Sequence, residues 1–441
     1  MREHKHADIF ISGIRNGEWR SNMTELYDMK AEQEKQERVI LVGVAVNEGD
    51  DTEESLDELA ELVLTAGAKT VGRVIQNRES IHPGTYIGKG KTEEVAALAQ
   101  ELDATGIVCD DELSPAQMRN LEDVLELKVM DRTMVILDIF AQRASTKEGK
   151  IQVELAQLRY RLTRLVGMRS SLSRLGGGIG TRGPGEKKLE VDRRLVRERI
   201  SQLKRELKEV ESGRETTRAL RGKNQVPVAA IVGYTNAGKS TLLNYLTGAG
   251  VLEEDKLFAT LDPTTRSLTL DDGQRILFTD TVGFIRKLPH HLIEAFRSTL
   301  EEAKYADLLL HVVDSASPAA DQQMHIVYET LKSLGIQDKP VITVWNKQDL
   351  LTGTVSARDF RADKTVKISA RTGEGIPDLL EAVEEILRGN KIRVEKTFPY
   401  DRAGDIQVIR RYGQLLREEY RPDGIFIEAY VPRDVYQKYL F

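Results

Sequence analysis

Residues 233–240 read Gly-Tyr-Thr-Asn-Ala-Gly-Lys-Ser, which is the G-x4-G-K-S/T spacing of a phosphate-binding loop. The loop follows the apolar run 228–232, which is typical of a buried strand, and it precedes a helix candidate. The glycines let backbone N–H groups curl around phosphate oxygens, and the helix N-terminus adds the positive end of its dipole. This segment therefore predicts a nucleoside triphosphate site in a doubly wound parallel α/β sheet.

Two side chains of the loop carry the expected chemistry. Lys239 is placed to reach the β- and γ-phosphates, and the Ser240 hydroxyl is placed to bind Mg²⁺. The other residues expected to contact the nucleotide here are Gly233, Tyr234, Thr235, Asn236, Ala237, Gly238 and Thr241.

A second motif, Asp280-Thr281-Val282-Gly283, follows the predicted strand 275–279. A carboxylate at this position approaches Mg²⁺, here through a water molecule, and the Gly283 N–H can be offered to the γ-phosphate. The motif is short and common by itself, so its place after the phosphate loop is what makes it informative.

Two loops further along the chain predict the base. Asn346-Lys347-Gln348-Asp349 follows the predicted strand 341–345, and its carboxylate can accept from N1–H and the 2-amino group of guanine. Adenine has no such donor pair, and an acceptor left unpaired costs about 1–3 kcal/mol. Ser369-Ala370-Arg371 follows the predicted strand 365–368, where a backbone N–H can reach guanine O6. The motifs in this order predict a Mg²⁺-dependent GTPase with GTP and GDP as its ligands.

A P-loop kinase is the competing enzyme class. It would share Lys239 and Ser240, but it would need a domain for its acceptor substrate and would not need Asn346–Asp349.

The segment 258–265 is the candidate switch I, and it offers three threonines, Thr260, Thr264 and Thr265. A threonine hydroxyl in this loop would complete the Mg²⁺ shell and make the order of the loop depend on the γ-phosphate. The residues alone do not choose among the three.

The composition bounds the other classes. The chain has 441 residues, 40% hydrophobic and 30% charged, which is typical of a soluble multidomain protein. The longest apolar runs are far shorter than the ~20 residues of a membrane span. A single cysteine, Cys109, excludes an intramolecular disulfide and fits a cytoplasmic, reducing location. The formal net charge of −6, taken as a whole, argues against a nucleic-acid partner.

Charge is distributed unevenly along the chain. Residues 150–225 hold 20 Lys+Arg and 9 Asp+Glu, a balance of +11, which leaves −17 for the remainder. The same segment carries two runs of apolar residues at heptad spacing, which predicts two packed helices. The runs are Ile151, Leu155, Leu158, Leu162, Leu165 and, after Leu189, Val196, Ile200, Leu203, Leu207, Val210. The glycine-rich stretch 176–186 between them predicts an antiparallel hairpin with a compact tip. A solvated helical face would also be charged, but this excess of basic residues favours an anionic partner.

We expect five segments in all. They are an N-terminal extension (1–37), a small α/β domain (38–148), the basic hairpin (149–225), the G domain (226–389) and a small α+β domain (390–441).

The chain resembles the HflX family, of the Obg–HflX group of translational GTPases, from about residue 38 onward. The resemblance rests on the motifs above and on 114–121, 131–133, 137–143, 149–159 and 280–286. It implies that Thr260 is the Mg²⁺ threonine, within a nucleotide-contacting set of Phe258, Ala259, Thr260, Leu261 and Asp262. It also implies a large ribosomal subunit partner, ribosome splitting, and rRNA contact by the hairpin near the peptidyl transferase centre. We expect a monomer.

Phe284 occupies the position where many small GTPases carry the glutamine that orients the attacking water. Phenylalanine has no donor or acceptor, so we expect slow intrinsic hydrolysis with help from elsewhere. One hypothesis is a K⁺ ion held at Asn236, as in several GTPases without the glutamine; the other is ordering of the switches by the ribosome. Asn236 could equally bond its own loop backbone. The expected catalytic set is Lys239, Thr260, Gly283 and Asn236.

The alternative function is a membrane-associated or stress-signalling GTPase that acts on a protein partner without ribosome binding. It would share the whole nucleotide site. A lipidation signal would be expected for a membrane-bound form, and the segment 437–441 carries none. Peripheral membrane association stays open.

Overall fold

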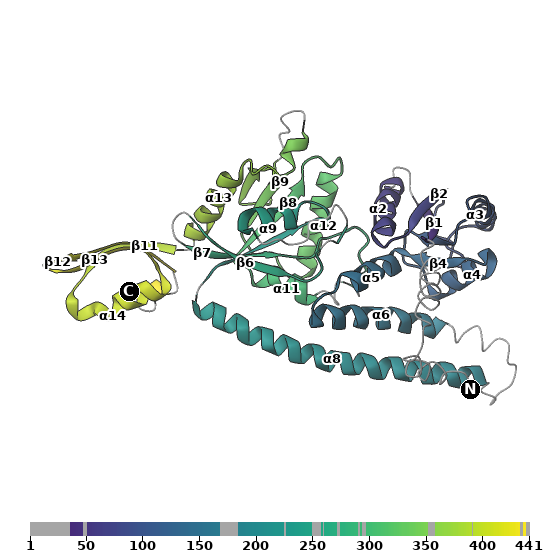
Figure 1. Ribbon diagram of the computed structural model, residues 1–441, viewed down its shortest axis with the longest axis horizontal. Coiled ribbons are helices and arrows are strands. Elements are labelled where there is room, and N and C mark those ends of the chain that lie inside the picture. Colours follow the sequence, from purple (N-terminus) through teal and green to yellow (C-terminus); the bar gives the residue numbers. More distant parts are fainter. Residues whose placement is uncertain are drawn as a thin grey trace, which may run out of the picture.

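The computed structural model arranges the chain as three domains in a row with a long helical hairpin along one side (Figure 1). The residues that the structure describes are 36–46, 51–167, 184–224, 226–248, 257–258, 260–270, 274–289, 292, 297–351, 358–389, 391–432 and 435–437. The predicted N-terminal extension therefore lies almost wholly outside the described residues, as do most of the predicted glycine-rich tip and Ala259.

The N-terminal domain is a parallel sheet of order β2-β1-β3-β4 with helices against it. Its strands are β1 (Arg38–Ala45), β2 (Lys69–Asn77), β3 (Gly106–Cys109) and β4 (Lys128–Asp131). Its helices are α2 (Thr52–Thr65), α3 (Lys89–Glu101), α4 (Pro115–Leu125) and α5 (Arg132–Arg143). Ser114 starts α4 with a capping box to Gln117. The predicted α/β architecture of this domain is confirmed.

Two helices form the hairpin, α6 (Lys147–Gly167) and the longer α8 (Pro184–Asn224). The predicted heptad positions make the contact between them: Ile151, Leu155, Ile200 and Leu203 are buried in one cluster, flanked by Leu158, Leu162, Val196 and Leu207. Arg199 joins the two arms through paired hydrogen bonds to Glu154, at 2.8 and 3.0 Å. At ~1.5 Å rise per residue, the 41 residues of α8 span about 60 Å.

The G domain is a six-stranded sheet of order β10-β9-β8-β5-β7-β6, parallel except for β6. The strands are β5 (Val228–Gly233), β6 (Thr264–Thr269), β7 (Arg275–Asp280), β8 (Leu308–Asp314), β9 (Val341–Asn346) and β10 (Lys364–Lys367). The helices are α9 (Lys239–Thr247), α11 (Arg297–Tyr305), α12 (Ala320–Ser333), η1 (Gln348–Leu350) and α13 (Ile376–Gly389). The predicted doubly wound sheet is confirmed. The phosphate loop joins β5 to α9 at the carboxyl edge, where such sheets bind ligands.

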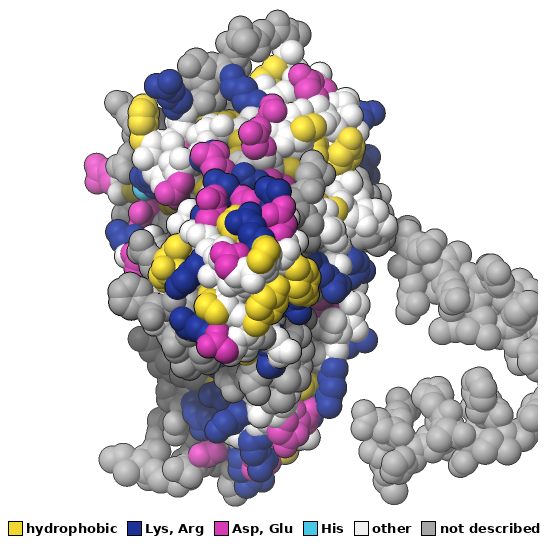
Figure 2. All heavy atoms as spheres, turned by 90° about the vertical axis from the view of Figure 1, so that its left-hand side faces the viewer, with side chains coloured by type: hydrophobic (Ala, Val, Ile, Leu, Met, Phe, Trp, Pro, Cys, Tyr) yellow, Lys and Arg dark blue, Asp and Glu magenta, His cyan; other side chains and the backbone are white. Residues whose placement is uncertain are grey.

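The C-terminal domain is an antiparallel sheet of order β11-β13-β12, with α14 packed on one face. Its elements are β11 (Lys391–Phe398), η2 (Tyr400–Arg402), α14 (Ala403–Tyr412), β12 (Gln414–Arg421) and β13 (Gly424–Pro432). A helix against an antiparallel sheet is the α+β arrangement that the sequence predicts for this segment. Tyr400, Leu415, Leu416 and Tyr420 are exposed here. Figure 2, which faces this end of the molecule, shows apolar side chains gathered among charged ones.

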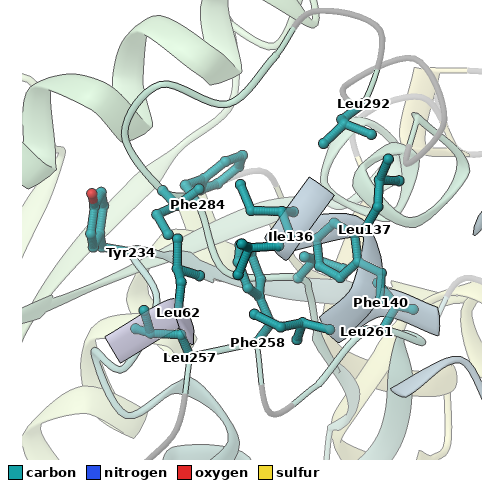
Figure 3. Close-up of a cluster of buried hydrophobic side chains, with 14 of the residues drawn as sticks. Leu62, Ile136, Leu137, Phe140, Tyr234, Leu257, Phe258, Leu261, Phe284 and Leu292 are labelled. Carbon is teal, nitrogen blue, oxygen red and sulfur yellow. The ribbon is translucent and has the colours of Figure 1, made fainter. Parts of the chain in front are cut away.

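One buried apolar cluster is shared by the N-terminal and G domains, which the sequence treats as separate units. Figure 3 shows it: Leu62 from α2 and Ile136, Leu137 and Phe140 from α5 meet Tyr234, Leu257, Phe258, Leu261, Phe284 and Leu292 of the G domain. The rings of Phe140 and Phe258 pack edge to face with centroids 4.7 Å apart. The G-domain members come from the phosphate loop, from switch I with its neighbour Leu257, and from the segment that follows Asp280–Gly283, here called switch II. This interface therefore bears directly on the nucleotide site.

Candidate nucleotide-binding site

The phosphate loop has the backbone that its glycines and asparagine allow. Gly238 has a φ of 92° and Asn236 a φ of 59°, a region that glycine and asparagine tolerate best. Lys239 begins α9 and donates from Nζ to the Tyr234 carbonyl at 2.7 Å. Burial lowers the pKa of Lys239 to about 8, although Asp280 opposes the shift. A buried ammonium facing backbone oxygen is poised to exchange that partner for phosphate.

Three oxygen-bearing side chains meet beside this loop. The Ser240 hydroxyl donates to Asp280 Oδ2 at 2.7 Å, and its oxygen lies 2.8 Å from Thr260 Oγ1. Thr264 and Thr265 belong to β6 instead, and Thr265 pairs with Thr279 at 2.9 Å. Of the three candidate threonines, the structure therefore brings Thr260 to Ser240.

This corner fits a magnesium ion. Octahedral Mg²⁺ has oxygen ligands at 2.0–2.1 Å, so adjacent ligands lie about 2.9 Å apart, close to the Ser240–Thr260 spacing of 2.8 Å. Asp280 Oδ1 is buried and has no hydrogen-bond partner among the described residues. Burial raises the pKa of Asp280, against the opposing effects of Lys239, Ser240 and Thr260. A cation at this corner would reverse the cost of burying that carboxylate.

Gly283 touches the phosphate loop so closely that a side chain would not fit. A Cβ at Gly283 would lie 2.9 Å from Lys239 Nζ and from the Thr235 side chain. The next residue, Phe284, forms a short bridge to the loop, because its N–H donates to the Gly233 carbonyl at 3.1 Å and its carbonyl accepts from Thr235 N–H at 2.8 Å. Phe284 is 1% exposed, and its side chain lies in the interdomain cluster.

The two base motifs are held together by Asn346. Its amide donates to the Ala237 carbonyl at 2.9 Å, and its Oδ1 accepts from the Ala370 N–H at 2.9 Å. Ser369 donates to Asp349 Oδ1 at 2.7 Å and so orients the carboxylate. The phosphate loop and both base loops thus converge at one edge of the sheet.

Comparison with known proteins identifies the family. Three family models match in order along the chain: "GTP-binding GTPase N-terminal" over 53–141, "GTP-binding GTPase Middle Region" over 143–221, and "50S ribosome-binding GTPase" over 228–347. The GTPase HflX of Lacrimispora saccharolytica is 67% identical over 94% of this chain and 97% of its own length. The chain belongs to the HflX family of GTPases.

A more distant curated relative belongs to the same family. The GTPase HflX of Escherichia coli is 46% identical over 80% of this chain and 83% of its own length. A solved structure of a GTP-binding protein from Sulfolobus solfataricus in complex with GDP is 24% identical, covering 79% of this chain and 98% of that chain, with a TM-score of 0.43. This HflX-family chain is a GTPase, which excludes the kinase alternative. Among the described residues, no helix combines the length and apolarity that a membrane crossing requires.

Four predicted nucleotide contacts turn their side chains toward the N-terminal domain instead. Phe258 and Leu261 are buried in the interdomain cluster. The Tyr234 hydroxyl donates to Glu58 and accepts from the Arg286 N–H at 2.8 Å. Asp262 accepts hydrogen bonds from Ser145 and Thr146. Apolar side chains and a carboxylate are more favourably placed against that domain than beside a phosphate. The motifs that these residues belong to therefore did not reveal which way their side chains point.

Switch II continues into a charged contact that the sequence analysis missed. Arg286 pairs with Asp51 at 2.9 Å, and Lys287 lies 2.5 Å from Asp110. Behind them, the buried Arg132 bridges Glu58 and Asp110 at 2.6 and 2.7 Å. Burial opposes ionisation of Asp110, but Arg132 and Lys287 outweigh it and lower its pKa. The sequence signal was a pair of adjacent basic residues that begins three residues after Gly283.

Asp349→Asn tests the guanine assignment. An amide cannot accept from N1–H and the 2-amino group together, so GDP affinity should fall about 10- to 100-fold. Xanthosine diphosphate has a carbonyl in place of the amino group, and the amide can donate to it, so its binding should improve. Titration with fluorescent GDP and xanthosine diphosphate measures both. Unchanged GDP binding in this variant would contradict the assignment.

Proposed function

We propose that this GTPase associates with the large ribosomal subunit and splits stalled or idle ribosomes, with the basic hairpin contacting rRNA. The proposal rests on the way in which both ends of the hairpin connect to the nucleotide site. Helix α6 begins one residue after the Ser145–Thr146 pair that contacts switch I, and α8 ends four residues before β5, which leads into the phosphate loop. The "50S ribosome-binding GTPase" family model supports the same partner.

The charge of the hairpin supports RNA rather than protein. Residues 150–189, the first arm and the tip, hold nine Lys+Arg and two Asp+Glu, whereas 190–225 hold eleven and seven. The excess is thus greater in the first arm and the tip, at +7, than in the second arm, at +4. Along the described part of α8, Arg194, Arg197, Lys204, Arg205 and Lys208 are exposed. Basic side chains clustered on one projecting element form an electrostatic footprint for phosphate backbones.

In the nucleotide site, we assign roles by position. Ser240 and Thr260 would hold Mg²⁺ directly and Asp280 through water; the ion would neutralise charge on the β- and γ-phosphate oxygens. Lys239 and the Gly283 N–H would bind the same phosphates. Asp349, oriented by Ser369, would read guanine, and Asn346 would keep the base loops in register with the phosphate loop.

Catalytic assistance has to come from outside position 284, because the Phe284 ring is buried in the interdomain cluster. Asn236 is exposed at the phosphate loop, and we assign its amide oxygen as a ligand of a K⁺ ion. Turnover should therefore be faster in K⁺ than in Na⁺ buffer at equal ionic strength, and Asn236→Ala should abolish the difference. Equal rates in the two salts would remove the cation from the mechanism.

Co-sedimentation tests the ribosome assignment. The full chain should pellet with 50S and 70S particles in a non-hydrolysable GTP analogue and much less in GDP, and it should lower the 70S fraction on sucrose gradients. Sedimentation that ignores the nucleotide, or no sedimentation with 50S, would contradict the proposal. The latter result would favour a signalling GTPase with a protein partner.

A matched pair of variants tests the hairpin. Arg169→Ala, Arg174→Ala and Arg182→Ala together remove three charges around the tip. They should weaken 50S binding and make it less dependent on salt, because fewer phosphates are neutralised. Lys69, Lys304 and Lys332 are exposed outside the hairpin, and changing them to alanine alters the net charge equally. Equal losses in both triple variants would indicate only a long-range charge effect.

A further inference from the structure

We propose that Asp262 is a positioning residue. Its carboxylate, docked on the start of helix α6, holds switch I closed with the Thr260 hydroxyl beside Ser240, and so links the hairpin to the metal corner. The proposal concerns the GTPase reaction itself and does not depend on the identity of the partner at the hairpin tip.

Both oxygens of the Asp262 carboxylate accept hydrogen bonds in this contact. Asp262 Oδ2 accepts from the Ser145 N–H at 2.9 Å, the Ser145 hydroxyl at 2.7 Å and the Thr146 N–H at 2.9 Å. Asp262 Oδ1 accepts from the Thr146 hydroxyl at 2.5 Å. Hydrogen bonds to an ionised acceptor are about twice as strong as neutral ones. One half-buried carboxylate thus has four donors from two adjacent residues of another domain.

The donors lie at the N-terminus of helix α6, where the positive end of the helix dipole favours a negative charge. Thr146 directly precedes α6, and its hydroxyl oxygen accepts from the Gly149 N–H at 2.9 Å, the position of an N-cap. Thr146 therefore caps α6 and docks switch I with the same hydroxyl group. The negative Asp262 lies at the positive end of the α6 dipole.

Gly149 supports the same contact from the opposite side. A Cβ at this position would overlap Asp262 Oδ1, so the carboxylate reaches the helix only because residue 149 is glycine. Alanine would favour the helix by about 1 kcal/mol, since glycine is a poor helix former. Glycine at position 149 thus makes α6 less stable but leaves space for switch I to approach the helix.

The link to Thr260 is short. Leu261, the single residue between them, is 2% exposed in the interdomain cluster, and β6 begins two residues after Asp262. With Leu261 buried and Asp262 docked, the chain has little slack, so release of the carboxylate displaces the Thr260 hydroxyl. Because this threonine serves the metal when the γ-phosphate is present, the docked state should favour the triphosphate over the diphosphate.

Two substitutions disrupt the contact between Asp262 and helix α6, one on each side of it. Asp262→Ala removes the acceptor, and Gly149→Ala blocks its approach while leaving every switch I residue intact. In both variants, affinity for a fluorescent non-hydrolysable GTP analogue should fall about tenfold, and more Mg²⁺ should be needed for binding. GDP affinity should stay within twofold, which also shows that the protein is folded. The rate constant of hydrolysis should fall several-fold.

A carboxylate elsewhere in the G domain provides the control. Asp363 accepts a hydrogen bond from the Val341 N–H at 2.8 Å inside the G domain, so Asp363→Asn tests the loss of a comparable structural carboxylate. It should leave the ratio of the two affinities unchanged. If Gly149 served only the helix, Gly149→Ala would raise thermal stability and leave that ratio unchanged. An unchanged ratio in both Asp262→Ala and Gly149→Ala would overturn the proposal.

Discussion

Burial of the switch segments against the N-terminal domain is the constraint on which the rest of this structure depends. Phe258 and Leu261 of switch I and Phe284 of switch II are almost fully buried, and their partners Ile136 and Phe140 lie on α5. Burying one such side chain contributes about 1.5–3 kcal/mol. The switches therefore cannot open widely while the two domains stay packed, and the N-terminal domain is part of the nucleotide machinery.

The burial of the switch segments accounts for the absence of a water-orienting side chain at position 284. At the position where many small GTPases carry a water-orienting glutamine, Phe284 instead packs in the contact between the two domains. Arg286 and Lys287 extend the contact with ion pairs to acidic residues of the N-terminal domain. The hairpin is attached at both roots, to switch I through Thr146 and to the phosphate loop through β5. Force or binding energy at its tip can thus reach the site where GTP is hydrolysed.

Local chemistry made the nucleotide site and the hairpin predictable, whereas contacts between distant segments were not. The phosphate-loop motif 233–240 and the heptad runs of the hairpin, which include Leu203, are short patterns. In both, the spacing of the residues indicates the structure that they form. Asp262 meets Thr146 across 116 residues, and Tyr234 meets Glu58 across 176, with no periodicity to mark either pair. The short strand β4 runs directly into α5 without a break, and the strand β12 is rich in charged residues, so no clear sequence pattern marks either strand.

Amide hydrogen exchange of the full chain, compared in GDP and in a non-hydrolysable GTP analogue, tests the coupling most directly. Exchange should slow with the analogue in peptides over 257–262, over 144–149 and over α5 together, while peptides of the C-terminal sheet stay unchanged. Slower exchange in 257–262 with identical exchange in 144–149 and α5 would show that switch I closes without the N-terminal domain, and would contradict the account.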